Sequence, residues 1–374
     1  MLNESLSVYI HTPFCLSKCS YCDFFSVPFK KELYEGYKKS LFLEIKEALK
    51  KNIKVKSVYF GGGTPSALPE SFIPEIMNIL ASHTRISEKT EITAEANPSS
   101  ISRPLLSSWK KAGVTRTSIG IQSFKDEDLS VLGRLHNSET ARKSIRISHS
   151  FGPSEISLDL IFAVPGQKLD SYLGSLREAS KDADHISAYG LSIPNNSKMD
   201  KEGLKVSEEN YREMFLKGSD FLTSECFIHY EVSNFSRKNK HSRHNSSYWN
   251  GSEYAGLGPG AHSFINKKRY ANASSIEKYI TASKNGFKKL RTEDKRSASD
   301  KMFEDLFLGL RTKRGYIFGE MPEDKKKCFL DRNRAFLEIL QKRNLAFLEK
   351  ESLRLTPEGM LLMDNIIENL SIND

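Results

Sequence analysis

The sequence predicts an α/β fold: a partial (β/α)6 TIM-like barrel followed by a small, mostly helical C-terminal domain. Three observations predict it. In the first 200 residues, six short β-branched or aromatic runs alternate with helical patterns, which is typical of βα units in a parallel sheet. Cysteine, glycine, carboxylate and amide residues follow these runs, and active sites of barrels are built at the carboxyl ends of strands. Beyond residue 298, helical patterns dominate.

The individual elements follow in order along the chain. The predicted strands are residues 7–10, 57–60, 91–94, 117–121, 156–161 and 185–191. The clearest helical pattern has apolar residues four apart, which gives a stripe that packs on a sheet: Leu33, Tyr37, Leu41, Ile45 and Leu49. Further helical patterns cover residues 207–225, 299–315 and 332–344. With a linker at 291–298, we expect a core barrel at 1–200, an extension at 201–297 and a C-terminal domain at 298–374.

Length and composition limit the class of protein. The 374 residues exceed the ~250–300 at which a single core stops growing, which favours one large domain plus a smaller one. No apolar run approaches the ~18 residues of a membrane span, and the N-terminus lacks the pattern of a secretory signal. We therefore expect a cytoplasmic protein that is not an integral membrane protein. In that compartment clustered cysteines bind metal more often than they form disulfides.

The net charge of +9 has two interpretations. Basic residues are spread through helical stretches, which favours a solvated surface; the alternative is attraction to anionic ligands such as nucleotides or propionates. No motif of a nucleic-acid-binding protein accompanies the charge, so we predict no nucleic-acid partner.

Three of the five cysteines lie within eight positions. Cys15, Cys19 and Cys22 have C-x3-C-x2-C spacing, whereas Cys226 and Cys328 are isolated. A structural zinc site takes four closed ligands, commonly as two separated pairs, and no second pair exists. A cuboidal iron–sulfur cluster takes one ligand per iron, so three thiolates leave one iron open. The spacing therefore predicts a cluster with a vacant binding position.

Several residues at the predicted strand ends also indicate a ligand site on physical grounds. Gly61, Gly62 and Gly63 remove side chains where backbone must approach a ligand closely. A tight turn is the alternative, but the Thr-Pro that follows favours the ligand role. Asp159 interrupts the apolar run "SLDLIF", where a carboxylate is costly to bury without a partner.

The cysteine motif, with an aromatic residue before the last cysteine, resembles the radical S-adenosylmethionine (SAM) superfamily. There the open iron of a [4Fe–4S] cluster chelates the amino and carboxylate groups of SAM. Further motifs resemble the anaerobic coproporphyrinogen-III-oxidase-like family: "YIHTPFC", "CDFFS", "YFGGGTPS", "EANP", "SIGIQSF", "LGRLHN", "DLIFAVPGQ", "HISAYGLSIP", "YEVSNFS", "HNSSYW" and "GLGPGAHSF". The oxidases carry a fourth cysteine two residues after the third, where this chain has Phe24. Together with the HNxxYW signature at 244–249, this places the resemblance with the HemW-type heme chaperones.

The resemblance implies a set of SAM-binding residues, and no catalytic residue is assigned. Gly62, Gly63 and Thr64 would contact SAM, with the methionine amino group as their target. Glu95 would hold the ribose hydroxyls. The other implied ligands are Tyr9, Tyr21, Gln122, Arg134 and Asp159. In the oxidase branch the last three of these serve a second SAM, and the sequence leaves open whether this chain uses them.

Each of these residues also has a purely structural interpretation. Either tyrosine could simply pack its ring and hydrogen-bond its hydroxyl, and Arg134 could be a solvated basic residue. In "RHNSSYW", a packed loop anchored by Trp249 is the structural alternative, whereas the functional one is a heme-contacting surface with His244 as axial ligand. Competing candidates for that ligand are His11, Cys226, His229, His241 and His262.

Three functions remain open at this point. The resemblance favours a heme chaperone that binds heme and transfers it to acceptor hemoproteins, including respiratory-chain enzymes at the membrane. It also implies SAM binding without oxidase activity and a cluster-dependent homodimer. The alternatives are an oxygen-independent coproporphyrinogen III oxidase, acting by radical SAM oxidative decarboxylation in porphyrin biosynthesis, and a radical SAM enzyme with another substrate.

Overall fold

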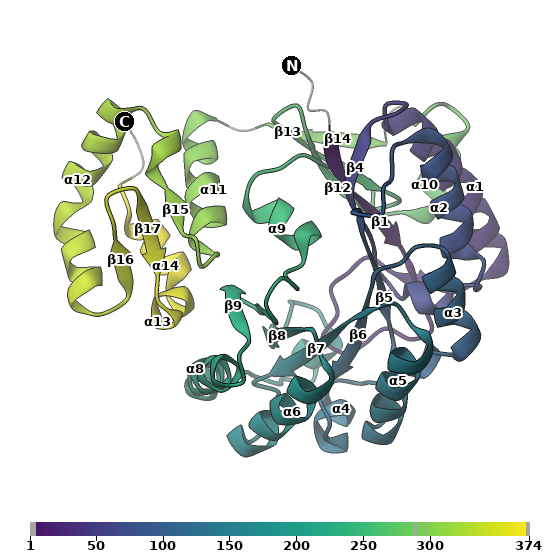
Figure 1. Cartoon of the computed structure of the whole chain (residues 1–374), viewed down its shortest axis with the longest axis horizontal. Helices are drawn as coiled ribbons and strands as arrows, with labels where there is room; N and C mark the ends of the chain where they lie inside the picture. The colour runs from purple at the N-terminus through teal and green to yellow at the C-terminus, as the bar shows by residue number, and fades with distance from the viewer. Residues whose placement is uncertain (1–4, 288–289, 296, 372–374) are drawn as a thin grey trace.

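The computed structural model describes residues 5–287, 290–295 and 297–371. Its central feature is a twelve-stranded sheet with the order β14-β13-β12-β11-β1-β4-β5-β6-β7-β8-β10-β9 (Figure 1). Neighbours from β1 to β8 in this order are parallel. All six predicted strands are confirmed: β1 (Ser5–Thr12), β4 (Lys54–Gly62), β5 (Glu91–Ala96), β6 (Arg116–Gln122), β7 (Glu155–Phe162) and β8 (His185–Gly190).

A seventh parallel strand comes from far along the chain. β11 (Tyr254–Leu257) pairs with β1 on the side away from β4, and Tyr9 lies opposite Gly256. The rest of the sheet is antiparallel at both edges: β10 (Asn234–Ser236) and β9 (Ile228–Glu231) on one side, β12 (His262–Ile265), β13 (Lys268–Asn272) and β14 (Arg291–Asp294) on the other. β14 corrects the predicted linker, because residues 291–294 form an edge strand rather than a connection.

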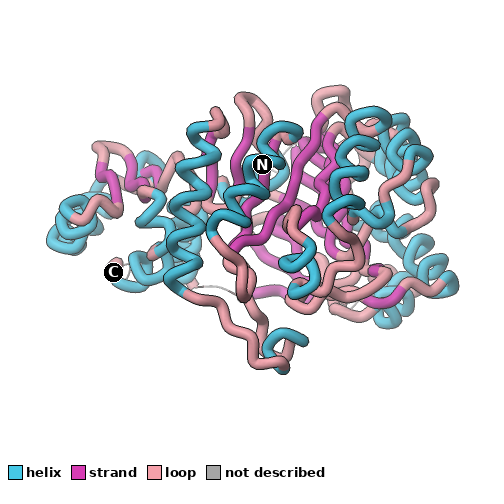
Figure 2. The backbone as a smooth tube through the Cα atoms, turned by 90° about the horizontal axis from the view of Figure 1, so that it is seen from below, coloured by secondary structure: helices cyan, strands magenta, loops and turns pink. Residues whose placement is uncertain are grey.

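Helices cover the outer face of the parallel strands (Figures 1 and 2). They are α1 (Lys31–Ala48), α2 (Phe72–His83), α3 (Arg103–Lys111), α4 (Asp126–Val131), α5 (Ser138–Phe151), α6 (Leu169–Asp182) and α8 (Glu208–Ser224). In α1 the predicted stripe is confirmed, since Tyr37, Leu41 and Ile45 are fully buried. Their apolar side chains pack against residues such as Val8 and Phe60 that point outward from the strands. This layer is the main core.

The inner face of the same strands is polar. Residues alternate along a strand between its two faces, so Ser57 and Tyr59 point opposite to Val58 and Phe60. Hydrogen bonds join the inner residues across strands, for example from the Ser57 hydroxyl to that of Ser7 at 2.9 Å. The short helix α9 (Arg243–Trp249) lies on this inner side, between the barrel and the C-terminal part (Figure 1).

The C-terminal part is helical, as predicted, but also holds a sheet that was not predicted. Its helices are α11 (Ala298–Leu310), α12 (Glu323–Lys342), α13 (Pro357–Leu361) and α14 (Met363–Asn369). They pack on the antiparallel strands β15 (Tyr316–Ile317), β17 (Ser352–Leu355) and β16 (Ala346–Leu348), in that order. Arg212 of α8 pairs with Glu358 of α13 at 2.8 Å. The predicted boundaries at 200 and 297 stay predictions.

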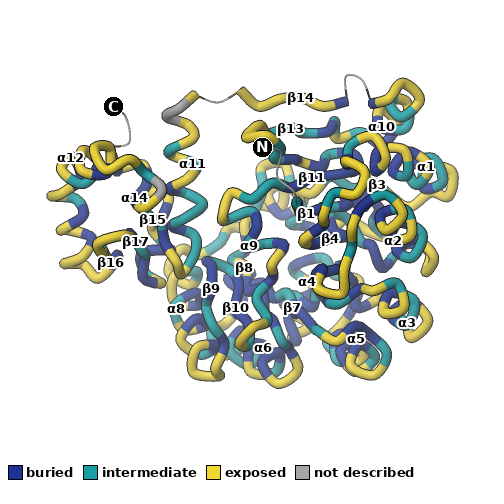
Figure 3. The backbone as a smooth tube through the Cα atoms, turned by 45° about the horizontal axis from the view of Figure 1, so that its top comes forward, coloured by how far each residue is buried: buried dark blue, intermediate teal, exposed yellow. Residues whose placement is uncertain are grey.

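Burial follows this layering (Figure 3). The parallel strands are mostly buried, whereas all four residues of β14 and many of α12 are exposed. Among the described residues, no helix is both long and apolar enough to cross a bilayer. The cytoplasmic location stays a prediction.

Candidate functional site

The cysteine motif lies on a loop that leaves the barrel after β1. The short strand β2 (Phe14–Cys15) pairs with β3 (Val27–Pro28), and these two strands enclose the loop with Cys19 and Cys22. The loop is held against the α4–α5 connection, because the Ser20 amide donates to the Leu132 carbonyl at 3.2 Å. All three cysteines are half-buried and form no disulfide.

Polar groups from other strands reach the sulfur atoms. The Thr64 hydroxyl donates to Cys15 Sγ at 3.5 Å. Arg134 Nη1 donates to Cys19 Sγ at 3.1 Å, and its Nη2 donates to the Gly120 carbonyl at 2.9 Å. Arg134 is therefore not the solvated residue of the structural interpretation, because both ends of its guanidinium fork are used. The fork ties the cysteine loop to β6.

The three sulfur atoms influence one another. Burial raises the pKa of the Cys22 thiol, and nearby Cys19 and Cys15 raise it further. Three thiolates so placed repel one another and need positive charge. Arg134 supplies one such charge, and its Nε is buried without a hydrogen-bond partner among the described residues.

The glycine stretch closes the gap between β4 and the cysteine loop. Gly62 has φ of +104°, and a Cβ there would lie 2.4 Å from the His11 ring. A Cβ on Gly63 would lie 2.6 Å from the carbonyl oxygens of Thr12 and Phe14. The Gly63 amide donates to that Thr12 carbonyl at 2.8 Å. Glycine is therefore required at both positions for close backbone approach, so the stretch is not only a tight turn.

Two carboxyl groups on the inner face have pKa values raised above their ordinary range. Glu95 accepts from the Tyr59 hydroxyl at 2.8 Å and from the Gly62 amide at 3.2 Å. Burial nevertheless raises its pKa to about 7, with a smaller contribution from Asp159. Burial likewise raises the pKa of Asp159 to about 6, although it accepts from the Ser118 hydroxyl at 3.2 Å. Both carboxyl groups therefore exchange their proton closer to neutral pH than ordinary carboxyl groups do, which is typical of ligand sites.

The remaining predicted ligands lie around these groups. Gln122 has φ of +66°, and its amide nitrogen lies over Gly120, where a Cβ would be only 2.8 Å away. Tyr9 shares a hydrogen bond of 3.1 Å with His11 Nδ1 and stacks on Tyr59 at 6.2 Å between ring centroids. Burial raises the pKa of Tyr21, and Arg134 lowers it, so the two are close.

His244 contacts the same group of inner-face residues, but its side chain is buried. It stacks on Tyr59 at 5.0 Å. Its Nδ1 bonds the Ser57 hydroxyl at 2.9 Å and its Nε2 bonds the Tyr248 hydroxyl at 2.8 Å. Burial lowers its pKa to about 3. Axial ligation of heme by His244 stays a prediction, and it requires one of these two hydrogen bonds to open.

The competing heme ligands differ in exposure. His11 and His229 are held by hydrogen bonds at both ring nitrogens. His241 stacks on Tyr230 at 4.4 Å. His262 and Cys226 are exposed. On accessibility alone, His262 and Cys226 are better placed to meet a ligand from solution than the ring of His244.

Sequence reasoning missed three residues that complete the site. Tyr59 joins Glu95 to His244, and Ser118 supports Asp159. Glu231, on β9, is buried with a pKa raised by burial to about 7. The alternation of polar and apolar residues in "SVYI" and "SVYF" could have identified the first, since it marks a polar inner face.

The residues fit an iron–sulfur cluster better than a single ion. Among the described residues, no group of three or more His, Cys, Asp or Glu side chains is placed to hold one metal ion. A cubane instead takes one thiolate per iron, so its ligands need not converge on one point. The three thiols, the charge of Arg134 and the glycine approach next to Cys15 fit such a cluster.

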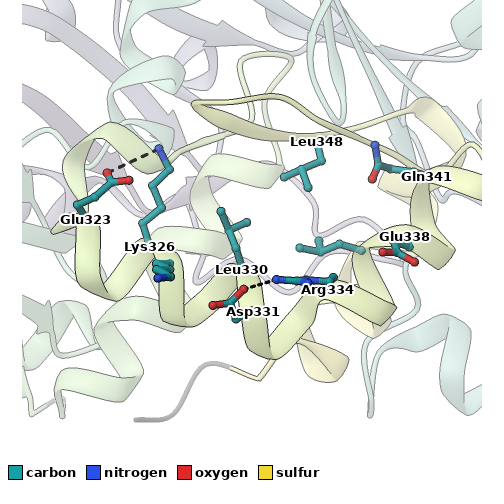
Figure 4. Close-up of a pocket in the computed structure, with 10 residues that line it drawn as sticks. Glu323, Lys326, Leu330, Asp331, Arg334, Glu338, Gln341 and Leu348 are labelled. Carbon is teal, nitrogen blue, oxygen red and sulfur yellow. Dashed lines mark hydrogen bonds and ion pairs between the residues drawn. The ribbon is translucent and has the colours of Figure 1, made fainter.

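A cavity lies away from these residues. It has a volume of about 500 Å³ and runs along α12 to Leu348 (Figure 4). Two ion pairs join its lining residues, Lys326 with Glu323 at 4.0 Å and Asp331 with Arg334 at 2.5 Å. None of the predicted site residues lines it.

Residues 9–179 match the model of the radical SAM superfamily. The heme chaperone HemW of Bacillus subtilis is 31% identical over 370 residues, which covers 96% of this chain and 97% of that protein. The chain belongs to the HemW-type family of radical SAM proteins. The heme chaperone HemW of Lactococcus lactis is 29% identical over 382 residues, covering 100% of this chain and 99% of that protein.

Membership of the HemW-type family agrees with the fold. The structure of coproporphyrinogen III oxidase, HemN, from Escherichia coli superimposes with a TM-score of 0.82 over 97% of this chain and 89% of that one. Its sequence identity is 20%, so this likeness concerns the fold alone. The predicted fold class and the predicted family are both confirmed.

Proposed function

We propose that this HemW-type protein is a heme chaperone that binds heme and transfers it to acceptor hemoproteins. The observation that carries the proposal is similarity along the full chain: proteins named heme chaperone match the C-terminal part as well as the barrel. The position of Phe24 supports it, since the resembling oxidases carry a cysteine there. Phe24 is 61% exposed beside the cysteine loop.

In this proposal Cys15, Cys19 and Cys22 hold a [4Fe–4S] cluster as thiolates. Such a cluster, when bound, supplies an open iron for the amino and carboxylate groups of SAM and a source of single electrons. Arg134 offsets the negative charge of the thiolates through its bond to Cys19. Thr64 orients Cys15 from the other side of the loop.

The neighbouring residues are proposed to hold SAM. Gly62 and Gly63 bring backbone close to the cysteine loop, where backbone groups would meet the amino acid part of SAM. Glu95 is a two-oxygen acceptor suited to a ribose diol, and proton uptake near neutral pH would weaken that interaction. Asp159 and Gln122 lie beside Arg134 and would bind further polar groups of the nucleoside or of a second SAM.

Heme is proposed to bind beside α9. The helix presents Tyr248 and Trp249 next to the inner face of the barrel, and large aromatic rings suit a flat, apolar macrocycle. His244 anchors the helix through Ser57 and Tyr59. Exposed His262 is an alternative axial ligand.

One preparation tests the proposal. The protein is reconstituted anaerobically with iron and sulfide, given SAM and a reductant, and then supplied in parallel with heme and with coproporphyrinogen III. Stoichiometric heme binding without decarboxylation, followed by heme transfer to an apo-hemoprotein, is expected. Formation of protoporphyrinogen in many turnovers would instead establish the oxidase activity.

A second comparison examines His244. The His244→Ala variant removes the bonds to Ser57 and Tyr248, whereas Tyr248→Phe removes only the second of them. If His244 is the axial ligand, only His244→Ala changes the heme absorption bands. Unchanged heme stoichiometry and bands in His244→Ala would remove that assignment and direct attention to His262.

A further inference from the structure

Four buried polar atoms without partners lie where the barrel meets the C-terminal part. Among the described residues, these are Arg311 Nε, Trp249 Nε1, Glu231 Oε2 and Asn234 Oδ1. A buried polar atom left without a hydrogen bond costs about 1–3 kcal/mol, so such atoms in one place indicate a missing partner. The four belong to α9, to the edge strands β9 and β10, and to the residue that ends α11.

Arg311 is fixed in position by both backbone and side chain. Its carbonyl accepts from the Val232 amide at 2.9 Å, and Thr312 forms an antiparallel bridge with Glu231. The guanidinium lies over the Trp249 ring at 4.7 Å and over the Phe307 ring at 5.4 Å from the ring centroids. Two aromatic rings therefore contact the cation, while its Nε donor has no hydrogen-bond partner among the described residues.

The positive charge of Arg311 is not neutralised in the described part of the chain. Arg311 forms no ion pair there, although Glu231 is near enough for its carboxyl to be influenced by the guanidinium. Glu231 Oε1 accepts from the Asn234 side-chain amide, and Glu231 Oε2 has no partner among the described residues. An anionic group from outside the chain would satisfy the guanidinium and the indole N–H together.

We propose that Arg311 and the indole N–H of Trp249 bind a carboxylate of the ligand, namely a propionate side chain of the tetrapyrrole. This inference rests on the proposed heme binding and names how the acidic edge of heme is recognised. A guanidinium binds a carboxylate through two parallel N–H donors, and the indole supplies a third.

The location suits a ligand with one acidic edge. Trp249 ends the helix that begins beside His244, and at about 1.5 Å per residue the two lie roughly 7–8 Å apart along the axis. Tyr189, on β8 next to β10, is 42% exposed and offers an aromatic surface on the adjoining strand. The propionate edge would bind at Arg311, with the apolar body toward the aromatic rings of Tyr189 and Tyr248.

The test uses two probes that differ only in the carboxylates: iron protoporphyrin IX and its dimethyl ester. Binding is titrated by absorption on the full-length chain. The wild-type protein should bind the ester about ten- to a hundredfold more weakly, the range for a charge-assisted hydrogen bond. The Arg311→Gln variant should bind both probes equally, at the affinity of the ester for the wild type. Exposed Arg314, changed to Gln, removes the same charge nearby and should preserve the preference.

A second, less disruptive variant tests the proposal if Arg311→Gln does not fold. Trp249→Phe keeps the stacking surface and the charge but removes the N–H, and should reduce the preference for heme over its ester about fivefold. The inference is overturned if Arg311→Gln or Trp249→Phe retains the full preference, or if the wild type binds both probes equally. A wild type that binds neither probe would instead overturn the proposed function.

Discussion

Replacing Glu95 by glutamine should stabilise the cofactor-free protein at pH 8 and destabilise it slightly at pH 5. Burial raises the pKa of this carboxyl from 4.5 to about 7. The folded state therefore holds its proton between these values while the unfolded state has released it. As a result, the free energy of unfolding falls as the pH rises through this window.

The magnitude follows from the displaced pKa. Moving it from 4.5 to about 7 corresponds to about 3 kcal/mol lost from the wild type by pH 8. Glutamine cannot accept from both the Tyr59 hydroxyl and the Gly62 amide, which costs about 1 kcal/mol at every pH. At pH 5 the wild type has already lost about 0.8 kcal/mol, so the variant should be less stable than the wild type by only a few tenths of a kcal/mol. At pH 8 the variant should be more stable by about 2 kcal/mol.

Urea unfolding followed by far-ultraviolet circular dichroism, at pH 5 and pH 8 under anaerobic reducing conditions, measures this crossing. Exposed Glu127, changed to glutamine, serves as the control and should show no crossing. Parallel pH profiles of Glu95→Gln and wild type would refute the reasoning. That result would mean that the Glu95 carboxyl ionises in the folded protein without loss of stability.

Other predictions concern the cysteine loop and the scaffold. Gly62→Ala should destabilise the chain by more than about 2 kcal/mol, since φ is +104° and a Cβ would meet the His11 ring, and a thermal melt measures this. Arg134→Met should lose bound iron faster on desalting, while Arg134→Lys should be intermediate; equal iron retention would contradict a role for the Cys19 contact. Glu44→Ala should cost about 3–5 kcal/mol in urea unfolding, because this fully buried carboxylate accepts from the Tyr279 hydroxyl and the Gly258 amide.

The parallel strands β1, β4, β5, β6, β7 and β8 were predictable because each is a β-branched or aromatic run followed by a punctuating motif, whereas the parallel strand β11 was not predicted. The strand β14 was not predicted either, since "RTED" has no apolar alternation and all four residues are exposed. It forms through backbone bonds to β13. The strands β15, β16 and β17 were missed because they have only two to four residues, too few for a period.

The candidate site was likewise predictable from the sequence only in part. Local motifs predicted Cys15, Gly62 and Glu95. In the structure, the Gly62 amide at the end of β4 donates to Glu95 on β5. The enclosure of His244 could not be predicted, because the Ser57 hydroxyl that bonds it is 187 residues away in sequence. The stacking of Arg311 on Trp249 likewise depends on how the C-terminal part meets the barrel.

The most direct test of the account concerns the open corner of the cluster. The chain is reconstituted with ⁵⁷Fe and its Mössbauer spectrum is recorded before and after adding SAM. We expect one iron in four to change its signal on SAM addition, because three irons are held by Cys15, Cys19 and Cys22. The Cys19→Ala variant should lose the cluster, whereas exposed Cys328→Ala should retain it. Four irons that respond alike, or a cluster that survives loss of Cys19, would contradict the account.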